Sequence, residues 1–152
     1  MRVQVNAYAG WRTSHGFDLH WDDHDVFVLQ VAGRKHWKIY GTTRKFPLGR
    51  DIEPAVGPPS QVLWDGLLEA GDLLYIPRGW WHVAQPLDEP TLHLTVGVNN
   101  LTGADFLKWL GDRMRKHEEV RRDIPHVAGT QKEYAAQLRD HWMDEFRPEL
   151  ID

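Results

Sequence analysis

The segment Gly71–His82, GDLLYIPRGWWH, decides the fold. Its first two residues predict a turn, Leu73–Ile76 predicts a short buried strand, and the Pro-Arg-Gly that follows predicts a second turn. His82 then lies two residues inside the next expected strand. A histidine held by a rigid strand suits a metal site, although a histidine packed between tryptophans explains this segment equally well.

The rest of residues 1 to about 100 repeats this pattern of short apolar stretches separated by Gly and Pro. Such spacing predicts an all-β sandwich or barrel. Eight short strands are expected, which fits a jelly-roll double sheet. They are Val3–Tyr8, Gly16–Trp21, Asp25–Val31, Lys35–Tyr40, Gln61–Leu68, Leu73–Ile76, Trp80–Gln85 and Thr91–Val98.

From Thr102 onward the period changes. Phe106, Leu110 and Met114 recur every fourth residue, which predicts an amphipathic helix. A second helix is expected to begin at Thr130, because Glu133 completes a capping box there. We therefore expect a β barrel over residues 1–100 and a helical C-terminal extension over residues 101–152.

Composition limits the chemistry. The chain has 152 residues, a net charge of −4 and no cysteine. The negative charge gives no general attraction to nucleic acids or anionic membranes. Without thiolates, any metal must be held by His, Asp or Glu. No apolar run approaches the roughly 20 residues that span a bilayer, and the N-terminus lacks a signal-peptide pattern, so we expect a cytoplasmic location.

A second motif lies in Leu19–His24, LHWDDH. If this segment is a strand, His20 and Asp22 point to the same side, because alternate residues of a strand share a face. One imidazole and one carboxylate make two-thirds of a facial triad, the Fe(II) site that leaves positions open for other ligands. Alone, the pattern is weak, and a polar loop at a strand end is its more common explanation. His24 matches no ligand position and is expected to be exposed to solvent.

Together, the motifs resemble a known family. Gly71, Pro77, Gly79 and His82 follow the spacing of the second cupin motif, and the whole segment resembles JmjC-type oxygenases. Residues 19–40 resemble the cupin-4 branch that includes the ribosomal oxygenases. The resemblance extends from about Asn6 to Val98.

The resemblance implies a mainly β fold, a double-stranded β-helix or jelly-roll cupin barrel, followed by a short helical C-terminal region. It also implies a 2-oxoglutarate-dependent dioxygenase that uses O₂ and binds Fe(II) through three catalytic ligands. These are His20, Asp22 and His82.

Lys35 is the first candidate for binding the cosubstrate. Alternation places Lys35 on one face with Trp37 and Ile39, where a lysine is costly unless it finds an anion or its amine reaches water. The resemblance assigns Lys35 to the distal carboxylate of 2-oxoglutarate and Thr95 to assist it. His93, on the same face as Thr95, is expected to be structural.

Asn6 and Tyr8 alternate onto one face of the first expected strand. They match an Asn-x-Tyr pair that lies near the substrate or cosubstrate in ribosomal oxygenases, although ordinary strand residues would look the same. Gly97 departs from the family, because some ribosomal oxygenases carry a small hydroxyl residue there that touches the substrate.

The activity implied by the resemblance is hydroxylation of an amino-acid side chain in a protein or peptide. A histidine or arginine of a ribosomal protein is one candidate. A homodimer is also implied, and the chain is expected to be a short form or a fragment of such an enzyme. Two alternatives remain open at this point, namely a non-redox metal-binding cupin and an inactive interaction domain.

Overall fold

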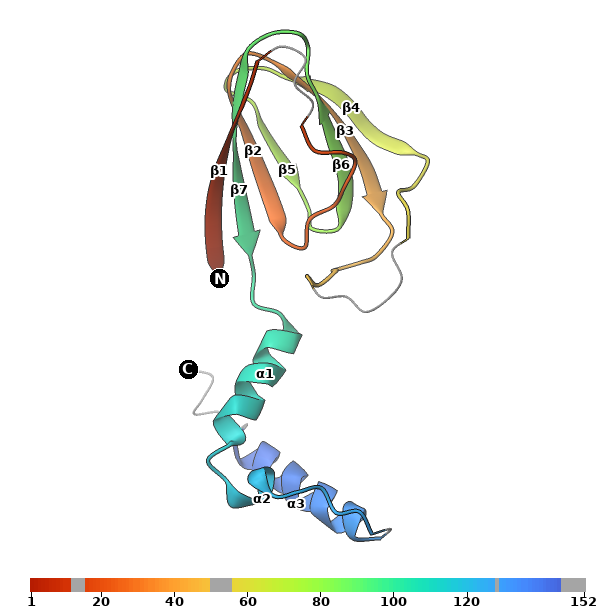
Figure 1. The fold of residues 1–152 in the computed structure, drawn as a ribbon, viewed down its shortest axis with the longest axis vertical. Coiled ribbons are helices and arrows are strands. Elements are labelled where there is room, and N and C mark those ends of the chain that lie inside the picture. Colours follow the sequence, from red (N-terminus) through yellow and green to blue (C-terminus); the bar gives the residue numbers. More distant parts are fainter. Residues whose placement is uncertain (12–15, 50–55, 128, 146–152) are drawn as a thin grey trace. The chain divides into compact units, whose positions relative to one another are not determined.

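The computed structural model describes residues 1–11, 16–49, 56–127 and 129–145. These residues form two compact units, Met1–Asn100 and Leu101–Asp152 (Figure 1). The first is built of strands and the second of helices. A mainly β fold followed by a helical C-terminal region, as the sequence predicts, is therefore confirmed.

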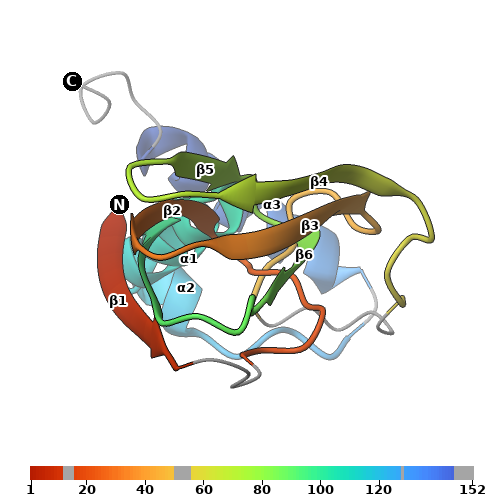
Figure 2. The same cartoon turned by 90° about the horizontal axis from the view of Figure 1, so that it is seen from above.

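Two antiparallel sheets make up the first unit, and they face each other around a common interior (Figures 1 and 2). The four-stranded sheet has the order β1 (Arg2–Gly10), β7 (Thr91–Asn99), β2 (Asp25–Ala32) and β5 (Leu73–Ile76). The three-stranded sheet has the order β4 (Val62–Leu68), β3 (Lys35–Thr42) and β6 (Trp80–Gln85).

One of the eight expected strands does not form. Between Gly16 and Trp21 only His20 pairs with another strand, through an isolated antiparallel bridge to His82. The prediction of a strand over Gly16–Trp21 was therefore wrong. Local alternation cannot tell whether a neighbouring strand edge will pair with the whole segment or with a single residue.

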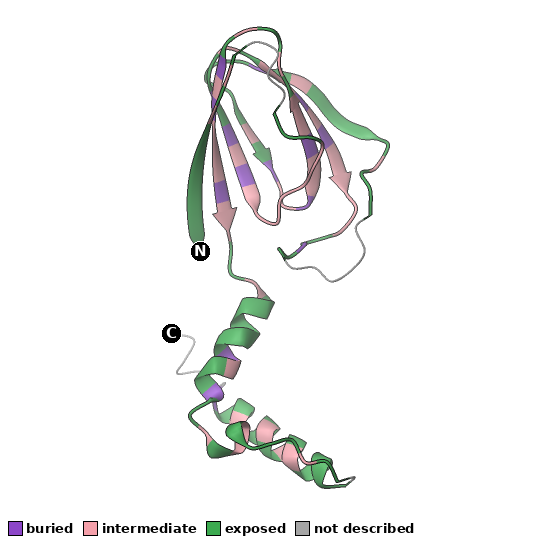
Figure 3. Ribbon diagram, viewed as in Figure 1, coloured by how far each residue is buried: buried purple, intermediate pink, exposed green. Residues whose placement is uncertain are grey.

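The packed core lies between the sheets and comes from alternation in the strands. In β2, Val26 and Val28 are buried, while Phe27 and Leu29 face outward. The buried set also draws on the other sheet and on β5 (Figure 3). It consists of Val26, Val28, Trp37, Ile39, Leu68 and Ile76.

The second unit contains α1 (Gly103–Met114), α2 (Glu118–Arg121) and α3 (Thr130–Glu145). Thr102 caps α1, since its hydroxyl accepts a bond from the Asp105 amide while the Asp105 carboxylate accepts one from the Thr102 amide. This reciprocal pair satisfies donors that a helix start leaves free. None of the helices formed by the described residues is both long and apolar enough to cross a membrane.

Candidate metal centre

His82 reaches the interior because the chain turns sharply just before β6. Gly79 has a φ of +80°, a conformation that side chains rarely adopt. A Cβ there would also lie 2.6 Å from Cδ of Pro47, so this turn requires glycine. β6 then pairs with β3, with His82 opposite Ile39, and the His82 residue is only 4% exposed.

Backbone hydrogen bonds, rather than a strand, place the segment with the other two residues of the motif. The His20 amide donates to the His82 carbonyl at 3.2 Å, and the His82 amide donates back to the His20 carbonyl at 2.7 Å. Two residues further, the Gly79 amide donates to the Asp22 carbonyl at 2.8 Å. These bonds fix the register of the segment against β6, so the two motifs meet although they are far apart in sequence.

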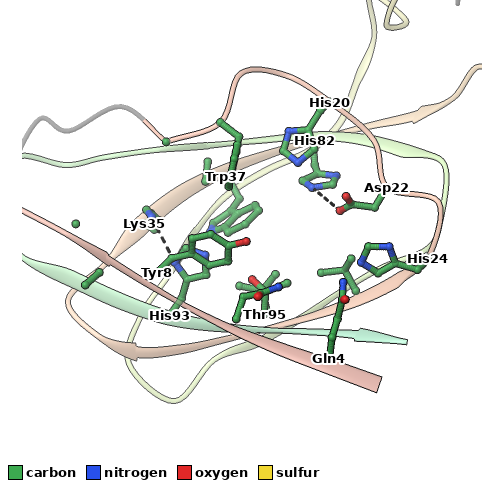
Figure 4. A pocket seen from close by; sticks show the side chains of 18 residues that line it. Gln4, Tyr8, His20, Asp22, His24, Lys35, Trp37, His82, His93 and Thr95 are labelled. Atoms are coloured by element: carbon green, nitrogen blue, oxygen red, sulfur yellow. Dashed lines mark hydrogen bonds and ion pairs between the residues drawn. The ribbon is translucent and has the colours of Figure 1, made fainter. Parts of the chain in front are cut away.

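The three side chains converge on one point. One ligand atom from each of His20, Asp22 and His82 lies within 4.8 Å of the other two. Nε2 of His82 is 3.5 Å from Oδ2 of Asp22, and the two imidazole rings are 4.4 Å apart between centroids (Figure 4). A single ion can therefore contact all three.

Both imidazoles are held in the tautomer that a metal needs. Nδ1 of His20 donates to the Asp18 carbonyl at 2.6 Å, and Nδ1 of His82 donates to the Trp80 carbonyl at 3.0 Å. A carbonyl only accepts, so each Nδ1 carries the proton and each Nε2 keeps its lone pair. Burial lowers the pKa of His82, which favours the neutral form that binds metal.

The donor set fits a divalent metal. Two imidazole nitrogens and one carboxylate match the facial triad of non-haem Fe(II) sites, which occupies one side of the ion. The three side chains here line a cavity of about 360 Å³. Its wall includes all three side chains together with residues from β1, β2, β3 and β7. Further ligands could therefore reach an ion held by these side chains from the cavity.

A half-buried lysine marks one end of this cavity. Nζ of Lys35 lies 3.3 Å from Nδ1 of His93, which can accept a bond from the ammonium. Burial lowers the pKa of Lys35, and burial together with the Lys35 charge lowers the pKa of His93 to about 4. Within the described part of the chain no carboxylate pairs with Lys35, so this end of the cavity suits an incoming anion.

The remaining predicted site residues also line the cavity. Asn6 and Thr95 lie opposite each other in the pairing of β1 with β7, and Tyr8 lies opposite His93. The Tyr8 ring stacks on the His93 imidazole with centroids 5.0 Å apart. Tyr8 and Thr95 therefore lie on the β1–β7 wall of the cavity, and Tyr8 stacks on the histidine that contacts Lys35.

Sequence reasoning missed two residues. His24, expected to be exposed, points into the cavity with a side chain that is 14% exposed, and Gln4 lies beside it (Figure 4). Two weak features of the sequence pointed to these residues. Gln4 shares the inward face of β1 with Asn6 and Tyr8, and Gly97 leaves an opening on β7 that another side chain can fill.

The fold and the site together define a metal-binding double-stranded β-helix, and comparison with known proteins gives the family. A family model described as the JmjC domain matches residues 1–106. The chain therefore belongs to the JmjC domain family, as the sequence predicts.

Known relatives are longer. A bifunctional lysine-specific demethylase and histidyl-hydroxylase NO66 from Brugia malayi is 38% identical over 136 residues, which cover 81% of this chain and 19% of that protein. Ribosomal oxygenase 1 from Gallus gallus is 39% identical over 111 residues, covering 70% and 18%. The chain thus spans about a fifth of the length of these curated relatives.

A solved structure of the ribosomal oxygenase YcfD from Escherichia coli, in complex with cobalt and 2-oxoglutarate, superposes with a TM-score of 0.61. The two sequences are 25% identical, and the match covers 88% of this chain and 36% of that one. The double-stranded β-helix predicted from the sequence is confirmed by this likeness.

Proposed function

We propose that this chain is the catalytic domain of a 2-oxoglutarate-dependent oxygenase that hydroxylates an amino-acid side chain of a protein or peptide. The observation that carries the proposal is the presence, in one cavity, of a His-Asp-His cluster and of Lys35, which has no carboxylate partner among the described residues. The similarity to YcfD, whose structure holds cobalt and 2-oxoglutarate, supports the same reading.

Each residue has a role that follows from its position. His20, Asp22 and His82 would hold the metal, with Asp22 offsetting part of its positive charge. Lys35 and Thr95 would bind the distal carboxylate of 2-oxoglutarate. Fe(II) held there would couple oxidation of 2-oxoglutarate by O₂, giving succinate and CO₂, to insertion of the second oxygen atom into a substrate C–H bond.

The chain's own apolar residues would keep the reaction away from bulk water. Trp37 is buried beside both ends of the site, since its ring lies 6.2 Å from that of His82 and 5.6 Å from that of His93. Val26 and Val28 form the cavity wall on β2. A dry wall strengthens the electrostatic contact between Lys35 and a bound carboxylate.

The target side chain is the finer part of the proposal. The names of the relatives from Brugia malayi and Gallus gallus describe a histidyl-hydroxylase and a ribosomal oxygenase. A histidine or arginine of a ribosomal protein is accordingly the substrate we propose, with Asn6 and Tyr8 near it. We further propose that residues 1–100 form the catalytic barrel and residues 101–152 a helical extension. A homodimer and a cytoplasmic location stay predictions.

The lysine distinguishes this function from a non-redox metal-binding cupin, which has no need for a cation inside the barrel. The test is succinate formation from 2-oxoglutarate by the purified chain with Fe(II) and ascorbate under air. We expect turnover by the wild type and none by Asp22→Ala. His126→Ala, which changes an exposed histidine in the helical unit, is the matched control and should be fully active. A wild type that binds metal but never consumes 2-oxoglutarate would instead indicate the non-redox cupin.

A further inference from the structure

The turn that leads into β6 has two central amides that bond outside it. The Trp80 amide donates to the Pro77 carbonyl at 3.1 Å and closes the turn. Its third residue is Gly79, whose φ of +80° is typical of a type II turn. In such a turn the N–H groups of the two central residues, Arg78 and Gly79, have no acceptor within the turn itself. The acceptors that they find decide how the turn is anchored.

Both amides donate to the short segment that carries Asp22. The Gly79 amide donates to the main-chain carbonyl of Asp22 at 2.8 Å. The Arg78 amide donates to Oδ1 of Asp25, the first residue of β2, at 3.1 Å. His82 lies only three residues beyond this turn, so the two bonds set where its strand starts relative to Asp22. Of the two acceptors, only the Asp25 carboxylate is a side chain and can be changed by substitution.

The Asp25 carboxylate accepts two further hydrogen bonds, which differ from the first in their surroundings. The Tyr75 hydroxyl donates to Oδ1 at 3.0 Å, and Nδ2 of Asn100 donates to Oδ2 at 3.2 Å. Both of these bonds are exposed, whereas the bond from the Arg78 amide is partly buried. Water replaces an exposed bond at little cost, but a partly buried amide that loses a charged acceptor has no equal substitute.

We propose that Asp25 is a positioning residue of the metal centre, which acts through the turn and holds His82 in register with Asp22. The proposal rests on the metal centre of the proposed function. Ligands bind a metal well only when neighbouring groups hold them close to the required geometry. Without Asp25 the Arg78 side of the turn is released, and the ion has to order the ligands at its own expense.

The first test compares two substitutions of Asp25 in the full 152-residue chain. Asp25→Ala removes the acceptor and should raise the Kd for Mn(II), measured by calorimetry, about tenfold, the lower end of the loss typical for groups that orient metal ligands. Asp25→Asn keeps an oxygen that accepts the Arg78 amide, and the Asn100 amide can rotate to pair with the new NH₂ group. Its Kd should therefore stay within about threefold of the wild-type value.

Two control variants separate positioning from general stability. Tyr75→Phe and Asn100→Ala each remove one exposed bond to the same carboxylate and leave the Arg78 amide bonded. Each should lower the free energy of unfolding in urea slightly, because one hydrogen bond is lost. The Kd for Mn(II) should change less than about twofold in both.

A second pair of variants acts on the donor instead of the acceptor. Arg78→Pro removes the amide hydrogen, and proline suits the second position of a type II turn. Arg78→Ala keeps the amide but loses the same side chain, including the contact of the guanidinium with the Phe46 ring. We expect Arg78→Pro to reproduce the tenfold loss of Asp25→Ala and Arg78→Ala to bind Mn(II) like the wild type. Combining Arg78→Pro with Asp25→Ala should add nothing, because both remove the same bond.

The outcomes distinguish this inference from the proposed function. A wild type that binds no Mn(II) refutes the metal centre and with it the proposed function. A wild type that binds Mn(II), with equal Kd values in Asp25→Ala and Tyr75→Phe, refutes the role of Asp25 alone. A loss in Asp25→Asn as large as in Asp25→Ala does the same.

One measurement needs no substitution and decides the case in which the variants do not fold. Hydrogen exchange of the Arg78 amide, followed by NMR in the wild-type apoprotein, should be slow because the amide is bonded to Asp25. Exchange as fast as in an unfolded peptide would overturn the proposal.

Discussion

In most sheets with one exposed face, the inner face is apolar and the outer face is polar. The four-stranded sheet shows the opposite distribution over much of its area. On β1 and β7 the inward side chains are largely polar and line the cavity. They are Gln4, Asn6, Tyr8, His93 and Thr95. The outward side chains of the sheet are apolar and many are exposed. They include Val3, Val5, Leu29, Val31, Leu73 and Tyr75.

The outward residues form rows across the sheet. Val5 lies opposite Val96, Val96 opposite Phe27, and Phe27 opposite Tyr75. Such cross-strand pairs stabilise a sheet from outside. The comparison shows that the inward positions of β1 and β7 carry polar side chains that line the cavity, while the inward Val26 and Val28 of β2 belong to the apolar core and give the cavity an apolar wall. Inward residues should therefore fall into a functional group and a structural group.

The largest effect is expected on metal binding. His82→Ala removes one of three ligands and should weaken Mn(II) binding at least about 100-fold, which calorimetry can measure. The control variant is His36→Ala. It removes a histidine from the outer face of β3, where the imidazole contacts Asp65 and Gln85. Equal Mn(II) affinity in the two variants would mean that the cluster does not bind the ion.

The next effect concerns the lysine end. Lys35→Met keeps the length and the apolar stem of the side chain but removes the charge. Loss of one charge-assisted contact should raise the Kd for 2-oxoglutarate by about 10- to 100-fold in Mn(II)-loaded protein, while Mn(II) affinity stays the same. An unchanged Kd would show that the lysine reaches water instead of the cosubstrate.

Stability should separate the structural inward positions from the outer face. Val28 is fully buried and Val31 on the same strand is 42% exposed. Val28→Ala should lower the free energy of unfolding by about 2 kcal/mol, whereas Val31→Ala should lower it by less than about 1 kcal/mol. Urea denaturation measures both. Similar losses would indicate that the outer face is covered in solution.

The smallest effect is a pH dependence from His93, which is 5% exposed and has a pKa of about 4 instead of 6.5. The unfolded chain takes up a proton below pH 6.5 while the folded chain does not, so this contribution to stability is present above pH 6.5 and is lost as the pH falls toward 4. The apoprotein should lose about 1 kcal/mol between pH 6.5 and 5.5 from this group. His93→Gln should flatten the profile over that interval, and an unchanged slope would assign the loss elsewhere.

Much of the barrel could be predicted from the sequence, because each strand shows its own alternation. The strands Leu73–Ile76 and Trp80–Gln85 have the predicted bounds. The bounds of the other confirmed strands differ from the prediction by at most two residues at one or both ends. Alternation also grouped Lys35 with Trp37 and placed His93 and Thr95 on one face. These properties depend on neighbours within a few residues, which a single sequence displays.

The arrangement of the site residues could not be predicted in the same way, because it depends on contacts between segments that are distant in the sequence. His20 and Asp22 were expected to share a face because they lie on a strand, yet their segment is a loop attached to β6 by backbone bonds from His82 and Gly79. The expected convergence occurs for a different reason. The inward position of His24 depends on the absent side chain of Gly97, which is far along the chain. No local pattern carries that information.

The central claim is that three side chains from two distant segments hold one metal ion, and a crystal structure of the chain soaked with Mn(II) tests it most directly. The anomalous signal should show one ion within coordination distance of Nε2 of His20, Nε2 of His82 and the carboxylate of Asp22, with its free side facing the cavity. An ion bound elsewhere, or none at a saturating concentration, would contradict the account.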